Sequence, residues 1–335
     1  MELQFDTSIC ADCATVDCLV KCQYMHFDLE SARSERQKLN NGEDSPVLHN
    51  CATCYACEEY CKLGNHPFYQ IVDLQEQKGI WPAPRPIVHQ QVKMFSPKGD
   101  FVPREFAGVP VNLCLFPELQ GRLTGRLFEG TSVFFSRDLF CNLVYLHFAK
   151  NSVIKERVPG VIQRLAACNV EELVCFHDEC YALYASWAPA YGLEVPFRPV
   201  HLFKYLIDRL KENYSQVKKL GLKAAYQRPC STRLTPAKEP LLDELLELIG
   251  VERVPREYDR ENALCCGAIL RMHGREELAD DINKRNLDDM VRSGATACIF
   301  NCPFCYLTLG EMVAAKGLRP LLISDLCRLA LGEKL

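Results

Sequence analysis

Cysteine is the residue that most constrains this chain, because it occurs twenty times in 335 residues. Disulfide frameworks of that density belong mainly to short secreted domains, whereas the cysteines of cytosolic proteins more often bind metals or do redox chemistry. The N-terminus reads MELQFDTSICADC, without the basic and then apolar segments of a signal peptide. The apolar stretch near 297–315 is interrupted by Asn301, Pro303 and Glu311, so it falls short of the roughly eighteen residues of a membrane span. We therefore expect a cytoplasmic protein, not membrane-spanning, whose cysteines bind metal.

The charge balance and the glycine-rich segments indicate which classes of partner and cofactor this chain is expected to bind. Lysine plus arginine is 39 and aspartate plus glutamate is 43, and this balance suggests neither nucleic acid nor an anionic membrane as a partner. The chain has no Walker loop and no G-x-G-x-x-G motif, and its stretch GRLTGRLFEG lacks the required spacing. We therefore expect no flavin or nucleotide on this chain, so that a partner protein must provide it.

Two runs of four cysteines lie near the N-terminus. The first run has the spacing C-x2-C-x4-C-x3-C and consists of Cys10, Cys13, Cys18 and Cys22. The second run has the bacterial ferredoxin spacing C-x2-C-x2-C-x3-C and consists of Cys51, Cys54, Cys57 and Cys61. In two-cluster ferredoxins the fourth cysteine of each run binds the other cluster. We therefore predict two [4Fe-4S] cubanes, one on Cys10, Cys13, Cys18 and Cys61, and the other on Cys51, Cys54, Cys57 and Cys22.

Zinc is the alternative metal for these runs, although zinc sites usually show paired C-x2-C knuckles rather than runs of four. Two departures from the ferredoxin pattern are visible: the first run has two extra residues before its third cysteine, and Gln23 and Lys62 stand where a proline usually follows the fourth. The polar stretch SARSERQKLNNG between the runs contains good helix formers. We expect a mainly helical, two-cluster ferredoxin-like domain over 1–80, followed by an irregular proline-rich linker over 81–110.

From residue 111 onward, apolar strand-like segments alternate with amphipathic helical ones, which predicts an α/β fold. KEPLLDELLELIG predicts a helix that ends at Gly250, and REELADDINKRNLDDMVRSG predicts another. The segment ATACIF predicts a strand, and NCPFC follows it directly. Alpha/beta folds place functional loops at such strand ends. The fold class is therefore α+β overall, a helical domain followed by α/β modules.

Two adjacent cysteines, Cys265 and Cys266, occur in ENALCCGAILRMHG. Neighbouring Cα atoms lie about 3.8 Å apart, less than the roughly 4.4–6.8 Å that a disulfide needs. Both thiolates could instead bind one soft metal target, and Gly267 would let the backbone pass close to it. Including Cys230 before the pair, and Cys302 with Cys305 after it, the full pattern is C-x34-CCG-x34-C-x2-C.

This pattern resembles the signature of the CCG domain found in catalytic subunits of heterodisulfide reductases and their bacterial relatives. The resemblance implies a non-cubane [4Fe-4S] cluster held by five cysteines, which in this chain are Cys230, Cys265, Cys266, Cys302 and Cys305. The alternative is that these cysteines are buried and inert.

The same family normally carries two such modules, and an internal repeat is visible. Aligning CFHDECYALY (175–184) with FNCPFCYLTL (300–309) pairs Cys180 with Cys305 and His177 with Cys302. Cys141 lies 36 residues before His177 and Cys266 lies 36 residues before Cys302, so these two cysteines pair as well. In the first copy, Phe140 and Asn142 then replace Cys265 and Gly267, and Cys114 takes the place of Cys230. We therefore expect a degenerate CCG module over 111–215 and an intact one over 216–335.

The degenerate module still offers four metal ligands. They are Cys114, Cys141, His177 and Cys180. This set suits one further iron–sulfur cluster, either a cubane with one histidine or a two-iron cluster, since imidazole is an established iron ligand. Cys175 could replace His177, and a cluster-free module kept for its fold is the alternative.

The resemblance implies an oxidoreductase subunit, and we expect it to transfer electrons between a flavin-containing, heterodisulfide-reductase-A-like partner and the CCG-bound cluster. Similar soluble proteins include the iron–sulfur subunit of the tungsten-dependent benzoyl-coenzyme A reductase complex of anaerobes. Two alternatives are a disulfide or thiol reductase of the heterodisulfide reductase type and an iron–sulfur subunit of a membrane-associated respiratory dehydrogenase. The catalytic residues, the electron acceptor and the complex are not specified by these motifs.

Overall fold

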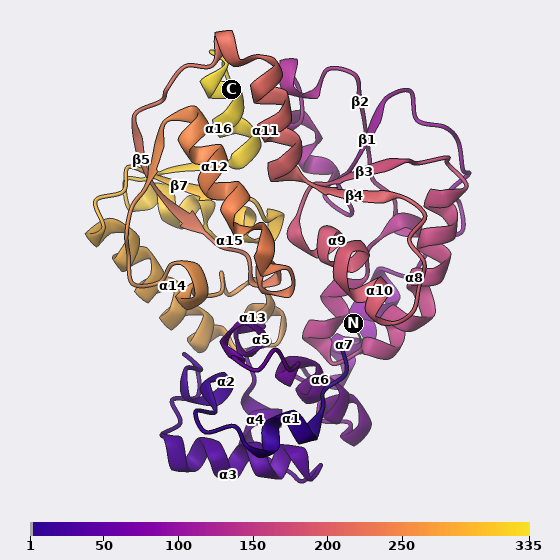
Figure 1. Ribbon diagram of the computed structural model, residues 1–335, viewed down its shortest axis with the longest axis vertical. Helices are drawn as coiled ribbons and strands as arrows, with labels where there is room; N and C mark the ends of the chain where they lie inside the picture. The colour runs from indigo at the N-terminus through magenta and orange to yellow at the C-terminus, as the bar shows by residue number, and fades with distance from the viewer. Residues whose placement is uncertain (1–2) are drawn as a thin grey trace.

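Helices make up the N-terminal unit of the computed structural model, which describes residues 3–335 (Figure 1). The helices of this unit and of the segment after it are α1 (Thr7–Ala11), α2 (Asp17–Val20), α3 (Leu29–Asn40), α4 (Pro46–Asn50), α5 (Ala56–Tyr60), α6 (Pro67–Lys78) and α7 (Arg85–Met94). The helix predicted between the cysteine runs is α3, and the Asp28 carboxylate caps it by accepting a hydrogen bond of 2.7 Å from the Ser31 amide. The cysteines lie mainly in the short helices and loops around this frame.

Residues 81–110 are not the irregular linker that the prolines predicted, because they contain α7. Pro86 lies in the first turn of that helix, where the missing amide hydrogen has no intrahelical role. The following residues, 95–108, are irregular. They are held by the buried Asp138 carboxylate, which accepts hydrogen bonds of 2.8 and 2.9 Å from the amides of Gly99 and Asp100.

Two four-stranded, all-parallel sheets follow, as the α/β pattern predicted. The first sheet has the order β2-β1-β3-β4, and its strands are β1 (Val109–Asn112), β2 (Thr131–Phe134), β3 (Glu172–Cys175) and β4 (Arg198–His201). The second has the order β6-β5-β7-β8, and its strands are β5 (Leu222–Gln227), β6 (Val251–Arg253), β7 (Ala297–Phe300) and β8 (Arg319–Leu322). The two orders are the same once the numbering is shifted by four, so the repeat seen in the sequence is a repeat of topology.

Helices connect the strands of each module. Those of the first module are η1 (Pro117–Arg122), η2 (Arg126–Phe128), η3 (Arg137–Leu139), η4 (Leu143–Phe148), α8 (Asn151–Ala166), α9 (Asp178–Ala182), the π-helical η5 (Leu183–Trp187), α10 (Ala188–Ala190), α11 (Leu202–Glu212) and η6 (Tyr214–Gln216). Those of the second are η7 (Cys230–Leu234), η8 (Pro236–Lys238), α12 (Glu239–Ile249), η9 (Arg260–Asn262), α13 (Ala268–Met272), α14 (Glu276–Arg292), α15 (Pro303–Ala315) and α16 (Ile323–Ala330).

The sequence-predicted elements of the second module are present. Helix α12 ends at Gly250, whose φ of +66° is in the left-handed region, and α14 and β7 occupy the other two predicted segments. The face of α12 that packs into the core repeats at helical spacing and consists of Leu242, Leu245, Leu246 and Ile249. Among residues 3–335, no helix combines the length and the apolar character needed to cross a bilayer.

The topology positions the functional loops. In each sheet the chain runs from the first strand to one neighbour and then returns to the other side, so a switch point lies between β1 and β3 and between β5 and β7. Ligands of open parallel sheets bind beyond the carboxyl ends of the strands at such points. The N-terminal unit, indigo in Figure 1, lies beneath both modules.

Candidate metal centres

The five cysteines of the CCG pattern, here called the CCG set, all follow strands of the second sheet. Cys230 begins η7 just after β5, the Cys265–Cys266 pair lies between β6 and α13, and Cys302 caps α15 after β7, with Cys305 one turn into that helix. Successive thiols are close neighbours in the order Cys230, Cys265, Cys266, Cys305 and Cys302. Segments distant in the sequence therefore place all five thiols around one location.

Gly267 is required at the third position of the CCG motif. Its φ is +82°, and a Cβ atom there would lie 3.2 Å from both the Ala279 Cβ and the Asn283 Oδ1 of α14. Its amide donates a hydrogen bond of 3.4 Å to the Cys265 sulfur. The glycine therefore permits a left-handed turn that is packed closely against α14 and presents both cysteines on one side.

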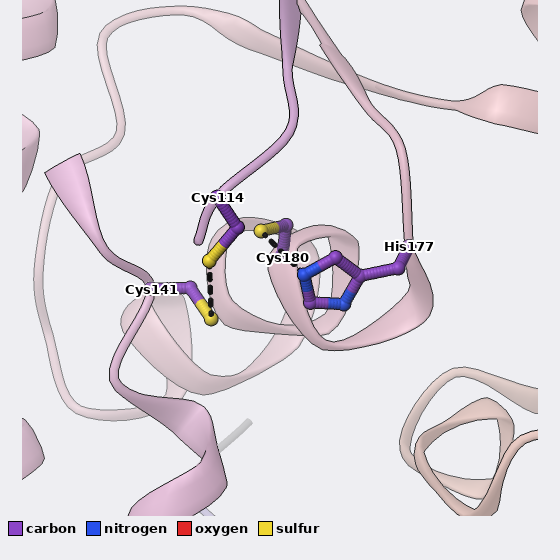
Figure 2. Close-up of side chains that lie close together, drawn as sticks. All are labelled: Cys114, Cys141, His177 and Cys180. Carbon is purple, nitrogen blue, oxygen red and sulfur yellow. Dashed lines mark hydrogen bonds between the residues drawn. The ribbon is translucent and has the colours of Figure 1, made fainter. Parts of the chain in front are cut away.

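The four ligands of the degenerate module, here called the Cys3His set, converge in the same way (Figure 2). Their ligating atoms all lie within 4.8 Å of one another, and all four residues are buried. The Cys114 and Cys141 sulfurs are 3.7 Å apart, and the Cys180 sulfur is 3.4 Å from Nε2 of His177. Cys175 is not a member, because its thiol points to the Leu173 carbonyl at 3.8 Å. The structure thus selects His177 over Cys175.

The backbone agrees with the alignment of the two modules. Asn142, which aligns with Gly267, also precedes a helix in the left-handed region, with a φ of +63°. Asparagine is among the non-glycine residues that adopt this conformation most readily. In the sequence the asparagine is only the loss of a glycine, whereas in the structure it preserves the turn.

The fourth cysteine of each N-terminal run lies near cysteines of the other run. Burial is the largest influence raising the pKa of Cys10 and Cys18, and nearby Cys61 raises both further. Burial likewise raises the pKa of Cys51 to about 12 and of Cys54 to about 11, and Cys22 adds to both. These are the neighbours that two clusters with exchanged ligands require. The clusters themselves stay a prediction.

Several features of the runs fit a bound metal group. Thiols with such raised pKa values stay protonated at neutral pH, whereas coordination to a metal deprotonates them. The ligand loops also contain non-glycine residues at positive φ, Val16, Thr53 and Tyr55, at 45°, 52° and 62°. Such backbone costs about 1–3 kcal/mol per residue and is concentrated at functional sites.

Arg36 is a residue that the sequence analysis missed. It is 3% exposed, and its guanidinium acts to lower the pKa of Cys10 and Cys18 against the larger effect of their burial. Among the described residues its three side-chain nitrogens have no oxygen or nitrogen acceptor, so the Cys18 thiol is the polar group that it meets. A buried guanidinium without acceptors is costly. The sulfur atoms of a cluster bound by the first run would provide both acceptors and negative charge. The only sequence signal was an arginine inside an otherwise ordinary polar helix.

Further residues missed by sequence reasoning join the second run to the CCG set. The Tyr24 hydroxyl accepts a hydrogen bond of 3.2 Å from the Cys265 amide, and Arg233 donates to the carbonyls of Cys54 at 3.2 Å and Ala263 at 2.7 Å. His147, from the first module, lies 2.9 Å from the Thr53 hydroxyl and 3.9 Å from the Cys230 sulfur. Most of these contacts join segments far apart in the sequence, so no local pattern could have found them.

An apolar cavity of about 210 Å³ lies between the two modules. It is lined partly by Phe116, Phe140 and Phe148 of the first module and by Met272 and Phe304 of the second. Cys114 and His177 form part of its wall. Phe304 stands between Cys302 and Cys305 in the sequence, so the segment that carries these two members of the CCG set also contributes to the cavity wall.

Comparison with known proteins agrees with this arrangement. Residues 224–310 match the CCG cysteine-rich domain, which contains the whole CCG set. The chain is 27% identical over 179 residues to a subunit of the dihydromethanophenazine:CoB–CoM heterodisulfide reductase from Methanosarcina acetivorans, covering 52% of this chain and 42% of the relative. It is 24% identical over 157 residues to a subunit of the fumarate reductase (CoM/CoB) from Methanothermobacter marburgensis, covering 45% and 30%.

A solved structure shares the fold. A hypothetical protein from Helicobacter pylori aligns with a TM-score of 0.54 at 13% identity, over 91% of this chain and 66% of that one. The chain spans less than half the length of the two curated relatives. Both relatives are named as subunits, which suggests protein partners. The domain match and the relatives together support an iron–sulfur redox subunit similar to that of the Methanosarcina heterodisulfide reductase.

Proposed function

We propose that this chain is an electron-transferring iron–sulfur subunit of an anaerobic multi-subunit redox complex. The observation that carries the proposal is that Cys54 of the second run lies near both Cys22 of the first run and Cys265 of the CCG set. When bound, iron–sulfur clusters on these three sets would supply one-electron transfer at potentials that the protein sets. The two cubanes and the non-cubane cluster inferred from the sequence motifs remain part of this proposal.

The chain's own residues connect these sets. Arg233 bonds the backbone on both sides of the junction between Cys54 and the CCG loop, and Tyr24 anchors the Cys265 amide. Arg228 forms a bidentate ion pair with Glu59, at 2.6 and 2.8 Å, which holds α5 against the second module. These buried charged contacts fix the distance between the two ligand loops.

The first run faces a redox partner in this proposal. Three of the four ligands predicted for the first cubane are partly exposed, compared with two of the four predicted for the second and two of the five in the CCG set. A protein partner could therefore approach the first run most closely. A flavin-containing, heterodisulfide-reductase-A-like subunit is the partner that the family resemblance favours, and the iron–sulfur subunit of a benzoyl-coenzyme A reductase complex is one setting for it.

The test is anaerobic purification followed by iron and sulfide analysis and low-temperature EPR. Wild-type protein should carry about twelve irons on the three sets, with one signal unlike a cubane. Cys265→Ser should abolish that signal and leave the ferredoxin-type signals, whereas Cys298→Ser, at a buried cysteine of β7 outside every set, should change neither. Zinc in place of iron on the N-terminal runs would refute the proposal.

Disulfide or thiol reduction is the second candidate function, and the apolar cavity favours it. A small thiol compound in this cavity would lie against Phe304, in the segment that carries Cys302 and Cys305. The test supplies reduced methyl viologen and a small organic disulfide, and it compares wild-type protein with Leu307→Trp, which narrows the cavity. Turnover that the tryptophan blocks would establish a reductase, and no turnover in the wild type would eliminate it.

Membrane docking through the C-terminus has less support. Most of α16 is buried, including Ile323, Leu326 and Cys327, so this helix packs into the second module. The respiratory-dehydrogenase alternative therefore lacks the exposed amphipathic C-terminal face that would favour it.

A further inference from the structure

We propose that His147 of the first module is a positioning residue for the CCG set: its imidazole donates a hydrogen bond to the Cys230 sulfur and raises the reduction potential of the cluster bound there. The inference rests on the function proposed above, because it concerns a residue that acts on that cluster through Cys230. It gives the first module a part in the redox centre of the second.

His147 lies where the N-terminal unit meets both modules. It belongs to η4 of the first module and is 1% exposed. Its Nδ1 atom is 2.9 Å from the hydroxyl of Thr53, in the loop of the second run, and its Nε2 atom is 3.9 Å from the sulfur of Cys230 in the CCG set. One buried imidazole therefore spans the interval between the second run and the CCG set.

Two left-handed residues of the second run contact this imidazole. Thr53 and Tyr55 have φ values of 52° and 62°. The Thr53 hydroxyl is the partner of Nδ1, and the centroid of the Tyr55 ring lies 4.6 Å from that of His147. Backbone of this kind is costly and persists only where the surrounding structure holds it in place. In this loop it directs both side chains against His147, which fixes the orientation of the imidazole.

The acceptors around the imidazole determine which nitrogen carries the hydrogen. Nε2 faces the Cys230 sulfur and, at 3.7 Å, the Glu179 carboxylate. A ligand thiolate and a carboxylate can only accept hydrogen bonds, so Nε2 is the donor. Nδ1 then accepts from the Thr53 hydroxyl, which can donate as well as accept. This tautomer gives both nitrogens of a buried, neutral imidazole a partner.

A hydrogen-bond donor at a ligand sulfur favours the reduced form of an iron–sulfur cluster, because the added electron makes the sulfurs more negative. Hydrogen bonds to the sulfurs are among the factors that set the reduction potentials of such clusters. The other contacts at this junction are of a different kind, since Tyr24 and Arg233 bond backbone atoms of the two ligand loops. His147 reaches a ligand sulfur itself, so it can change the potential as well as the position of the loop.

The equivalent residue of the second module is a methionine. Asn142 and Gly267 both precede a helix in the left-handed region. His147 stands five residues after the first of these turns, and Met272 stands five residues after the second. Met272 lines the cavity that Cys114 of the first module also borders. A thioether has no hydrogen to donate, so the repeat provides an N–H donor beside the CCG set and none from the equivalent position.

The experiment is an EPR-monitored redox titration of full-length protein purified without oxygen, with iron analysis of every sample. His147→Leu should lower the midpoint potential of the non-cubane signal, by about 59 mV if loss of the hydrogen bond makes reduction about tenfold less favourable. His147→Gln keeps an N–H donor and should lower the midpoint less. Thr53→Val removes the partner of Nδ1 and should shift the midpoint in the same direction. Because valine has the shape of threonine, a role of His147 in packing alone would leave the midpoint of this variant unchanged.

His273→Leu is the matched control. His273 is also a buried imidazole, 4% exposed, but neither of its ring nitrogens has a hydrogen-bond partner among the residues that the structure describes. Its replacement removes a buried imidazole and leaves the contact between His147 and Cys230 in place. The midpoint potential of this variant at neutral pH should therefore equal that of the wild type.

A wild-type midpoint in His147→Leu, with the iron content unchanged, overturns the proposal, and so does an equal shift in His273→Leu. Absence of the non-cubane signal from the wild type overturns the proposed function, and this inference with it, so the two failures are distinct. If His147→Leu does not fold or does not retain its iron, Thr53→Val decides, because an unchanged midpoint in that variant refutes the role of His147.

Discussion

Replacing Gly267 with alanine should destabilise the protein more than the same replacement at the nearby Gly274. A left-handed conformation costs an alanine about 1–2 kcal/mol. The added Cβ would also lie 3.2 Å from Ala279 and Asn283, both on α14, and overpacking of this kind costs about 1–3 kcal/mol more. The total predicted loss in the free energy of unfolding is therefore about 2–5 kcal/mol. Because the turn carries the CCG pair, the non-cubane EPR signal should weaken as well.

Gly274→Ala is the matched control for this prediction. Gly274 has a φ of +75° but no atom within 4 Å of its would-be Cβ, so only the left-handed penalty of about 1–2 kcal/mol applies. Anaerobic urea unfolding followed by circular dichroism measures both variants, and iron analysis with EPR follows the cluster. Equal destabilisation of the two variants, with a wild-type signal in Gly267→Ala, would refute the packing role assigned to Gly267.

Three further predictions concern buried charges. Arg36→Met should lower the reduction potential of the cluster on the first run, by about 60 mV if the guanidinium favours the reduced form by about 1.4 kcal/mol. Arg36→Lys keeps a positive charge and should lower the potential less. An EPR-monitored redox titration measures both potentials. Burial lowers the pKa of His273 from 6.5 to about 3. The stability that the neutral imidazole contributes is therefore complete above pH 6.5 and is lost as the pH falls toward 3. His273→Leu should reduce the pH dependence of urea unfolding between these two pH values. Arg228→Met removes the closest partner of Glu59, which keeps Arg233 at 3.5 Å, while Glu239 keeps its ion pair with Arg253 at 2.8 Å. The change should cost about 3 kcal/mol in urea unfolding, the lower end of the range for breaking a buried ion pair, and a double variant that also carries Glu59→Gln should cost less.

The parts of the fold that follow from local pattern could be predicted from sequence. Helix α12 has apolar residues at helical spacing and a glycine at its end, and β7 is a short apolar segment followed by a ligand loop. The repeat was visible because both modules keep the same ligand spacing from the strand end: His177 and Cys302 both stand two residues after their strands, and Cys180 and Cys305 five residues after. Helix spacing, strand ends and ligand spacing can be predicted because each depends on residues that are close together in the sequence.

The features that could not be predicted depend on distance in space. The proline count favoured an irregular segment around α7, because counting prolines ignores that a proline in the first helical turn is compatible with a helix. The roles of Tyr24, Arg36 and Arg233 arise from contacts with residues far along the chain, and their types are unremarkable where they stand. The sequence motifs likewise identified candidate ligands but not the distances between their ligating atoms.

Those distances decide what each module can hold. Both modules place ligands on the same three loops, at the same switch point of the same sheet, and both use a left-handed residue to turn the central loop. What differs is one position filled by Phe140 in place of a thiol and one filled by His177 in place of a cysteine. Among the described residues, the four ligating atoms of the Cys3His set all lie within 4.8 Å of one another, whereas the five thiols of the CCG set form no such group. A change of two side chains on a shared scaffold is therefore sufficient to change how many ligands a module presents and how closely they approach one another.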